Sequence, residues 1–439
     1  MGFRHALAAI ALGLGVAGAA AAQPAPADAP GGSVLIAGAR VFDGERLLGE
    51  RDVLVTNGRI AAVGEGLAAP AGTTRVDGRG KTLLPGLMDS HVHVFPTAAA
   101  DALRFGVTTE FDMFTIATPE LVQARHAARA AYARVTEADV WSAGMGVTPP
   151  GGHPSQMARS WGVTIPTLAN EADADAYIRA RVAEGSDYIK IFQDDGAAHG
   201  GAATLTPFAP ERLRVVIGAA QRADRRAIVH VSSLGDARLA IGFGANALAH
   251  MFQDHPADEA LVAQARQHGV TIIPTLSVLA GASGDPTSTR LAADPAVAPH
   301  LSPIQRSMIA ATFPRTRPNI LVNALESVRR LHAAGVVILA GTDAPNPTTA
   351  HGPSMHEELE LLVRAGMTPA EAISAATARP AAFFGTADRG RIAVGLRADL
   401  LLVEGDPLAD ITATRRIAGI WKNGFPVDRA AIPQMPAGN

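Results

Sequence analysis

The sequence predicts an α/β protein built as a TIM (β/α)8 barrel with a small β-sandwich domain formed by both chain ends. Two observations favour this fold class. Apolar strands alternate with amphipathic helices about eight times between residues 85 and 385, which fits the size of such a barrel. Short β-branched segments occur at both chain ends, and a few such strands bury themselves poorly alone. An open doubly wound sheet is the alternative, but no glycine-rich dinucleotide loop follows the first strand.

The composition narrows the range of functions. The chain of 439 residues is 48% hydrophobic and has a formal net charge of −3, so it is globular and has no basic surface that would indicate a nucleic-acid partner. It contains no cysteine. Disulfides, thiolate metal ligands, a cysteine nucleophile and a lipoprotein anchor are therefore excluded. A metal site would have to use histidine, carboxylates or an oxygen ligand derived from lysine.

The N-terminus has the pattern of a cleaved export signal. An uncharged Ala/Leu/Gly run over residues 6–22 ends in Ala20-Ala21-Ala22, an A-x-A-like cleavage pattern. The run is short for a membrane span. We expect residues 1–22 to be a signal peptide, residues 23–32 to be a flexible lead-in, and the mature protein to be periplasmic with no membrane partner.

The two chain ends are expected to meet in one domain. Asn57-Gly58 and Asn423-Gly424 are strong signals for two-residue hairpin turns between β-branched segments. We therefore assign residues 33–84 and 386–430 to the β-sandwich domain and residues 85–385 to the barrel.

The barrel region divides into strands, helices and one long connection. Residues 277–319 are rich in Pro, Ser, Thr and Ala, and a connection of this length is expected to be an irregular lid or binding loop. The clearest predicted helices are residues 119–134, 210–226 and 322–334. The predicted strands are residues 87–94, 107–113, 140–146, 188–192, 227–231, 247–251, 271–276 and 336–342.

The first predicted barrel strand ends in His91-Val92-His93. Side chains alternate along a strand, so both imidazoles point the same way. Each keeps a polar nitrogen that needs a partner when buried, and a metal ion is one such partner. Because His-x-His is a weak signal by itself, a surface pair or a hydrogen-bonded pair is the alternative.

Four further residues lie at or near the ends of predicted strands. Lys190 interrupts an apolar strand, and His230, His250 and Asp343 each follow one. Singly, each has an ordinary explanation: a lysine that reaches solvent, a hydrogen-bonded histidine or a turn aspartate. Barrel enzymes place their catalytic groups at the carboxyl ends of the strands. Together with His-x-His, these residues therefore favour one shared site.

Four motifs resemble the amidohydrolase superfamily, in particular its imidazolonepropionase-like and Xaa-Pro dipeptidase-like branch. They are P-G-L-M-D-S-H-V-H at 85–93, D-Y-I-K-I at 187–191, G-T-D-A at 341–344 and G-L-R-A-D-L at 395–400. The resemblance covers essentially the whole chain after the lead-in. It implies a TIM barrel with a β-sandwich made from both chain ends, in agreement with the pattern of strands.

The resemblance also implies two divalent metal ions, with Zn2+ as the expected species. The residues expected to hold them are His91, His93, Lys190, His230, His250 and Asp343. The first two histidines and the aspartate would hold one ion, and the two later histidines the other. Lys190, carboxylated on its amine, would bridge them.

The implied reaction is the attack of a metal-bridging hydroxide on an amide carbonyl. Asp343 would be the catalytic acid–base that passes the proton to the leaving amine. Neither G-x-S-x-G nor H-E-x-x-H is present as competing machinery. Ser232 stands where relatives often have a second histidine, and Asp194 and Asp195 replace expected small residues. The Ser232 departure concerns contacts around the ligands or with substrate and leaves the expected ligand set unchanged.

We expect a small-molecule amide substrate, namely a dipeptide or an N-acyl amino acid with an apolar side chain. His153 and His351 lie in loops after predicted strands and are the expected substrate-binding residues. Arg159, Arg315 and Arg317 could each offer a guanidinium fork to a substrate carboxylate.

Three alternatives remain open from the sequence. The first is a hydrolase of cyclic amides, imidazolones or lactones. The second is a single-metal deaminase of the same superfamily, against which the bridging Lys190 argues. The third is a catalytically silent relative, but this chain retains every expected ligand. The oligomeric state is left open by the sequence, and a homo-oligomer is one of the alternatives because multimers are frequent among relatives.

Overall fold

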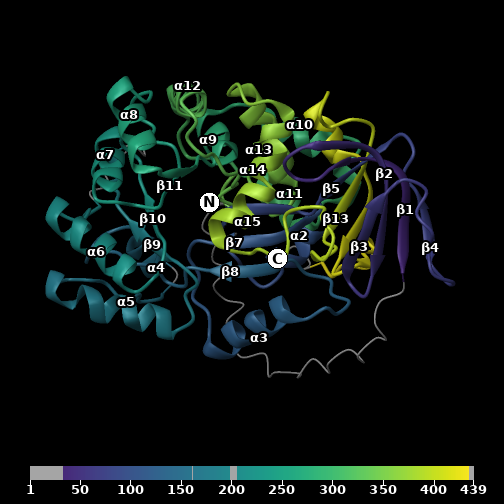
Figure 1. Ribbon diagram of the computed structural model, residues 1–439. Helices are drawn as coiled ribbons and strands as arrows, with labels where there is room; N and C mark the ends of the chain where they lie inside the picture. The colour runs from purple at the N-terminus through teal and green to yellow at the C-terminus, as the bar shows by residue number, and fades with distance from the viewer. Residues whose placement is uncertain (1–32, 161, 198–204, 435–439) are drawn as a thin grey trace.

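The computed structural model describes residues 33–434, except residue 161 and residues 198–204 (Figure 1). The expected signal peptide and flexible lead-in lie outside the described residues. Among the helices of the described part, none combines the length and the apolar character that a membrane crossing requires.

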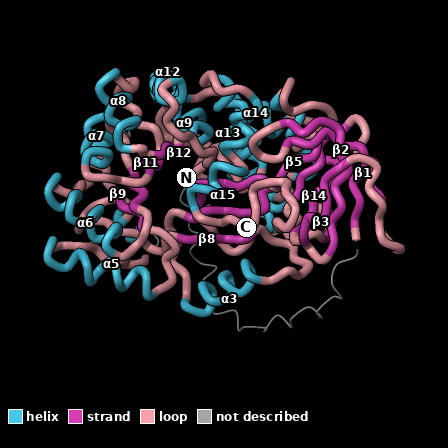
Figure 2. Tube along the Cα trace, viewed as in Figure 1, coloured by secondary structure: helices cyan, strands magenta, loops and turns pink. Residues whose placement is uncertain are grey.

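Strands from both chain ends pair in one sheet, which lies on the right of Figures 1 and 2. Its order is β15-β14-β13-β5-β1-β2-β3, with β4 beside β1. The junction between the ends is the antiparallel pair β5–β13, in which Leu84 faces Leu401. The strands are β1 (Val34–Phe42), β2 (Leu47–Thr56), β3 (Arg59–Gly64), β4 (Thr74–Asp77), β5 (Lys81–Pro85), β13 (Leu400–Glu404), β14 (Ile417–Lys422) and β15 (Phe425–Pro426).

Both predicted hairpin turns are confirmed. Asn57 and Gly58 join β2 to β3 with φ values of 50° and 75°, and Asn423 and Gly424 join β14 to β15 with 55° and 79°. Positive φ at both central positions is the requirement of the turn that matches strand twist. The two turns also pack against each other: a Cβ on Gly424 would lie 2.7 Å from the Cα of Gly58. Glycine is therefore needed there for space as well as for backbone conformation.

The remaining strands are parallel and form two sheets, of three and four strands. All residues of these strands are buried except in β8, which is half-buried at its end. Alternation of such strands with helices confirms the predicted α/β class. The three strands of the first sheet are β6 (Leu87–Val92), β7 (Val107–Asp112) and β8 (Asp139–Ser142), and those of the second are β9 (Ile189–Phe192), β10 (Ala227–His230), β11 (Ala247–Ala249) and β12 (Thr271–Ile273).

Helices cover the outer faces of these strands (Figure 2). In α6, for example, the buried residues Leu213, Val216, Ile217 and Ala220 recur at helical spacing. The α-helices are α2 (Ala98–Leu103), α3 (Pro119–Ala130), α4 (Ser155–Ser160), α5 (Ala174–Ala183), α6 (Pro210–Arg222), α7 (Leu234–Gly242), α8 (Glu259–His268), α9 (Leu276–Ser283), α10 (Thr287–Ala293), α11 (Pro303–Ala310), α12 (Asn319–Ala333), α13 (Pro353–Arg364), α14 (Pro369–Ala375) and α15 (Ala378–Phe384).

The predicted strand at 336–342 does not form as a regular strand. Its backbone still bonds to both neighbours: Leu339 N donates to Ile272 O at 2.9 Å, and Ser90 N donates to Ala340 O at 2.9 Å. The ladder is interrupted because Ala340 N donates instead to Ala375 O, at the end of α14. The segment therefore lies between β12 and β6 with isolated bridges only.

The expectation of an irregular connection at 277–319 is wrong. The segment contains most of α9, all of α10 and α11, and a 3-10 turn at Ala298–His300. Its Ser and Pro residues mark helix starts: Ser302 and Gln305 form a capping box, and Pro303 is the first residue of α11. Leu291, Leu301 and Met308 give the segment a hydrophobic cluster of its own.

A buried network of charged side chains joins β8 to the eight-stranded sheet that both chain ends form. Lys422 of β14 is fully buried, and its Nζ lies 2.7 Å from Asp139 Oδ2 and 2.9 Å from Asp399 Oδ2. Arg389 also pairs with Asp139, the first residue of β8. Burial alone would raise the pKa of Asp139, but the Lys422 and Arg389 cations outweigh it and lower that pKa. The network holds the two parts of the molecule together through charges that solvent cannot screen.

Replacing Lys422 with Met should lower the free energy of unfolding by about 3–5 kcal/mol, because it leaves buried carboxylates under-compensated. Urea unfolding at pH 7 measures this loss. The matched control is Lys81→Met, which removes a partly exposed ammonium 3.3 Å from Glu404 Oε1 and should change the same quantity by about 0–1 kcal/mol. Equal losses in the two variants would contradict the role given to the network.

Candidate metal centre

The candidate residues lie at the carboxyl ends of neighbouring strands. His91 is in β6 and His93 follows it directly, Lys190 is in β9, His230 ends β10 and His250 follows β11. Asp343 lies in the extended segment that bonds to β6, where its N–H donates to His91 O at 2.7 Å.

Asp343 is the centre of the cluster. Its Oδ1 lies 3.3 Å from His91 Nε2 and 3.0 Å from His93 Nε2, and its Oδ2 lies 3.8 Å from His250 Nδ1. Ligand atoms of His91, His250 and Asp343 all fall within 4.8 Å of one another. Imidazole nitrogens and a carboxylate at this spacing suit a divalent ion such as zinc.

His230 and Lys190 adjoin the same cluster. The ring centroid of His250 lies 4.5 Å from that of His91 and 4.5 Å from that of His230. Lys190 is fully buried, and its charge acts on both His91 and His250. The structure therefore groups His91, His250 and Asp343, with His93 and His230 beside them, and metal binding by the six expected residues stays a prediction.

Unpartnered buried atoms test whether these residues fit a metal. Neither ring nitrogen of His91 has a hydrogen-bond partner, and neither does Lys190 Nζ. A buried polar atom without a partner costs about 1–3 kcal/mol, so the cluster has donor atoms that a bound cation or its ligands would satisfy. The residues present therefore fit a metal centre.

Burial sets the protonation of the cluster. Burial lowers the pKa of Lys190 to about 7. Burial, followed by the Lys190 charge, holds the pKa of His91 well below its usual value. Burial and the neighbouring His230 do the same for His250. Neutral imidazole is the form that binds metal, so these histidines are ready to act as ligands at neutral pH.

Three neighbouring side chains orient the cluster. Asp89 accepts hydrogen bonds from His91 N at 3.2 Å and from Thr342 Oγ1 at 2.7 Å, and burial raises its pKa to about 7. Thr275 Oγ1 lies 2.9 Å from His250 Nδ1. Asp194 Oδ2 lies 3.3 Å from His230 Nε2. The Thr275 and Asp194 contacts fix the tautomer and the direction of the His250 and His230 rings, whereas Asp89 holds the backbone of His91.

The backbone around the cluster is strained. His250, Thr275 and Asp343 have φ values of 70°, 50° and 58°, a region that non-glycine residues adopt rarely. Gly341 allows the segment of Asp343 to approach β6, because a Cβ there would lie 2.9 Å from His91 Cβ. The strain and the close approach aim the carboxylate at the histidines.

The two expected substrate contacts lie in different surroundings. The His153 ring is 5.0 Å from that of His230, and its Nδ1 is 2.9 Å from Gln156 Nε2. His351 is almost fully buried, with Nδ1 2.6 Å from Glu110 Oε1. His153 therefore adjoins the cluster, whereas His351 pairs with a buried acid. Contact of either residue with substrate stays a prediction.

Sequence reasoning missed Glu110 as well as Asp89 and Thr275. The signal for Glu110 was a carboxylate in the middle of the strand V-T-T-E-F-D, all of which is buried. A carboxylate in such a strand needs a buried partner, but the sequence does not show that His351, far along the chain, supplies it.

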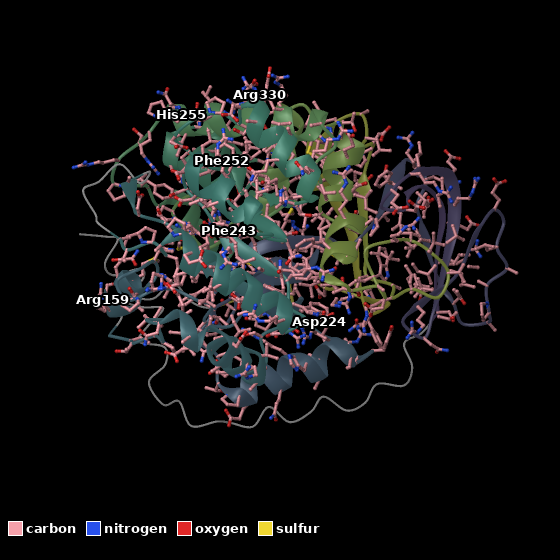
Figure 3. The ribbon with its side chains drawn as sticks, turned by 60° about the vertical axis from the view of Figure 1, so that its left-hand side comes forward. Arg159, Asp224, Phe243, Phe252, His255 and Arg330 are labelled. Carbon is pink, nitrogen blue, oxygen red and sulfur yellow. The ribbon has the colours of Figure 1, made fainter. Side chains whose placement is uncertain are left out.

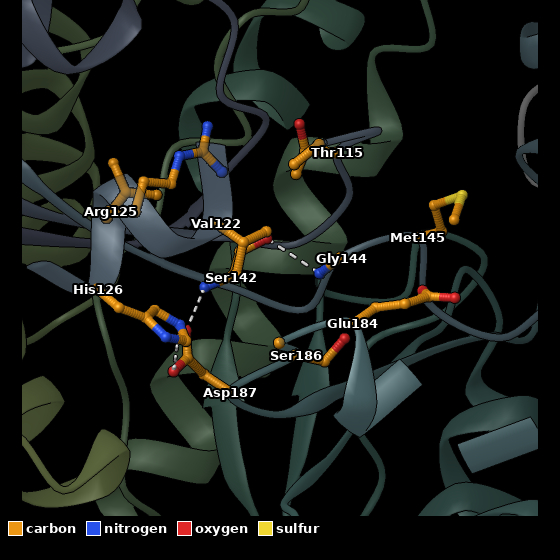
Figure 4. Close-up of a pocket in the computed structure, with 13 residues that line it drawn as sticks. Thr115, Val122, Arg125, His126, Ser142, Gly144, Met145, Glu184, Ser186 and Asp187 are labelled. Atoms are coloured by element: carbon orange, nitrogen blue, oxygen red, sulfur yellow. Dashed lines mark hydrogen bonds and ion pairs between the residues drawn. The ribbon is translucent and has the colours of Figure 1, made fainter. Parts of the chain in front are cut away.

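A separate cavity lies between α3, β8 and the segment before β9 (Figure 4). It is partly open to solvent, and His126, Ser142 and Asp187 are among its lining residues. Asp187 Oδ2 accepts hydrogen bonds from Arg129 Nη1 and Ser142 N, both at 2.9 Å. None of the six clustered residues lines this cavity.

Histidines, a lysine and an aspartate gathered at the carboxyl ends of parallel strands form a candidate metal site where barrel enzymes place their catalytic groups. Residues 82–427 match the Amidohydrolase family. The chain therefore belongs to the amidohydrolase family and is a hydrolytic enzyme. This confirms the family resemblance and the enzyme class expected from the sequence.

Individual relatives support the same branch of the family. An imidazolonepropionase of Salinispora arenicola is 27% identical over 410 residues, 85% of this chain and 91% of its own length. An ochratoxinase of Aspergillus niger is 26% identical over 253 residues, 56% of this chain, and the match spans only 47% of its length. The crystal structure of a Xaa-Pro dipeptidase with bound methionine shares the fold, with a TM-score of 0.71, 22% identity, and coverage of 90% of this chain and 100% of that one.

The buried pair of His351 and Glu110 should make stability depend on pH. Burial would lower the pKa of His351, but the charge and hydrogen bond of Glu110 outweigh it and raise that pKa. A raised folded-state pKa adds stability that is fully present below the unfolded value of about 6.5 and is lost as pH rises through the folded value.

We therefore expect His351→Gln to destabilise the protein by about 3 kcal/mol near pH 6 and by less near pH 9, as measured by urea unfolding. The control is His332→Gln, since His332 Nε2 lies 3.3 Å from Glu371 Oε2 in a partly exposed pair. That variant should lose about 1 kcal/mol or less at either pH. A loss from His351→Gln that does not change with pH would count against the ion pair.

Proposed function

We propose that this protein is a binuclear metal-dependent hydrolase that cleaves an amide bond in dipeptides or N-acyl amino acids. The observation that carries the proposal is the buried, unpartnered Lys190 Nζ beside the histidine–aspartate cluster. Addition of the neutral amine to CO2 forms an N–C bond and releases a proton, giving an anionic carbamate. That change replaces an unpartnered amine with an oxygen ligand, which a two-ion site requires.

The proposed ligand set has two halves. His91, His93 and Asp343 would hold one divalent ion, and His230 and His250 the other, with carboxylated Lys190 shared between them. Zinc is the proposed species, because the set consists of imidazole and carboxylate ligands with no thiolate. When bound, such ions act as a Lewis acid on a carbonyl and lower the pKa of a water molecule.

The residues of this chain supply the proton transfer. Asp343 is held by its strained backbone, and its side chain keeps 12% of its surface exposed. Its carboxylate would accept the proton of the attacking water and pass it to the leaving amine. Asp89 fixes the same segment by accepting from Thr342 N at 3.0 Å, so we assign Asp89 a positioning role.

We also infer that the two parallel sheets and the 336–344 segment close into a (β/α)8 barrel. Support comes from the isolated bridges: Val147 with Ile191 joins the first sheet to the second, Ile272 with Ile338 joins the second to the segment, and Val92 with Ala344 returns to β6. The β-sandwich assignment and the domain limits remain part of this proposal.

Dipeptides and N-acyl amino acids suit the surroundings of the cluster. His153 and Asp194 adjoin His230, and Gln253 follows His250 by three residues, so the surroundings of the cluster are polar. One alternative has specific support, because the imidazolonepropionase relative matches 85% of this chain. Hydrolysis of a cyclic amide is therefore the second candidate function, and a periplasmic location would weaken it.

Metal analysis tests the binuclear site. Zinc-loaded protein should contain about two divalent ions per chain. Lys190→Ala should bind less metal, and its kcat should fall by at least about 100-fold, because the bridging ligand is gone. Lys81→Ala, in the partly exposed pair with Glu404, is the matched control, and circular dichroism verifies folding. A folded Lys190→Ala protein with both ions and full activity would overturn the bridging role.

A substrate panel tests the reaction. Wild-type protein with zinc restored should hydrolyse linear amides, in Xaa-Pro dipeptides, other dipeptides or N-acyl amino acids with apolar side chains, because these place a carbonyl at the cluster. Cyclic ureides, imidazolones and lactones complete the panel, and product formation by mass spectrometry measures each rate. Rapid turnover of the cyclic compounds with inert linear amides would replace the proposal with the second candidate.

A further inference from the structure

An arginine from a distant part of the chain reaches the neighbourhood of the cluster. Arg317 lies between α11 and α12, and its backbone N–H donates to Ala282 O at 2.9 Å. Its Nη1 donates to Gln253 Oε1 at 2.8 Å. The guanidinium is half-buried, so it is held in place and still reachable.

Gln253 links Arg317 to two loops that carry candidate ligands. It lies three residues after His250, in the loop that follows β11. Its backbone N–H donates to Ser232 O at 3.0 Å, in the loop that follows His230 and β10. The residue that fixes the guanidinium therefore lies in the loop that carries His250 and is bonded to the loop that follows His230.

Electrostatics gives a second, independent link to the cluster. The charge of Asp194 acts on Arg317. The same carboxylate lies 3.3 Å from His230 Nε2, and its Oδ1 accepts from Ser232 Oγ at 2.7 Å. Burial lowers the pKa of Arg317 and the Asp194 charge opposes that shift. An arginine nevertheless stays cationic at neutral pH.

We propose that Arg317 binds the carboxylate of the substrate and thereby restricts the enzyme to dipeptides and N-acyl amino acids with a free carboxylate beside the scissile amide. The guanidinium has five N–H donors in a planar fork that matches a carboxylate, and one of its nitrogens is oriented by Gln253. The inference rests on the proposed function for the reaction, but it makes a separate claim about ligand recognition.

The other two arginines that the sequence offered are matched controls. Arg159 is exposed in α4 and lies at the outer edge of the molecule in Figure 3. Arg315 is exposed two residues before Arg317. Replacing either one removes an equal charge from the protein without touching the Gln253 contact.

Kinetics with paired substrates gives the first test. For the best linear amide of the panel, Arg317→Gln should raise KM about 100-fold with kcat changed less than about threefold. The carboxamide analogue of that substrate should be unaffected. Arg317→Lys keeps the charge without the planar fork, so its KM should lie between those of the wild type and Arg317→Gln. Arg315→Gln and Arg159→Gln should have the KM of the wild type. If Arg317→Gln raised KM equally for the carboxylate substrate and for its carboxamide analogue, Arg317 would have a structural role and the inference would be overturned.

A binding measurement separates this inference from the proposed function. N-benzyl-L-leucine has a carboxylate and no cleavable amide, so calorimetry with zinc-loaded protein reports recognition without turnover. Wild type should bind it, and Arg317→Gln should bind about 100-fold more weakly. If no linear amide is hydrolysed but this difference holds, the proposed function fails and the assignment of Arg317 as the carboxylate-binding residue stands. No binding to wild type, or equal binding to both, overturns the inference.

Discussion

The main physical constraint on this structure is the burial of ionisable groups whose hydrogen-bonding capacity the surrounding side chains do not satisfy. Lys190 and His91 are fully buried, and neither the amine nor the two ring nitrogens have a hydrogen-bond partner. Such groups destabilise the fold unless a ligand compensates them. The fold carries this instability at the carboxyl ends of its parallel strands, where Asp89, Thr275 and Asp194 hold the surroundings in one geometry.

The location of the cluster could be predicted from the sequence, because it depends on local pattern. The histidines, Lys190 and Asp343 each follow or interrupt an apolar run, and parallel strands bring such positions to one end of a sheet. The hairpin turns were predictable for the same reason, since Asn-Gly has a backbone requirement of its own. Partners contributed by remote segments were not predictable: nothing in the sequence pairs Glu110 with His351, or Arg317 with Gln253.

Two errors in the predicted fold have a common cause. Residues 336–342 are apolar enough for a strand, yet Ala340 N bonds to the end of α14, so tertiary contacts override local preference. At 277–319 the Ser and Pro residues suggested a loop, although they cap helices whose apolar faces pack on Phe105 and Ala350. In both cases the deciding contact comes from elsewhere in the chain.

The junction of the two chain ends has a kinetic consequence. Arg59 Nη1 donates to Gly395 O across 336 residues, and β5 needs β13 beside it to complete the sheet. Pairings of such long sequence separation form slowly. During synthesis, β1–β5 emerge more than 300 residues before β13, so the edge of β5 remains open to other chains until residues 400–404 have left the ribosome.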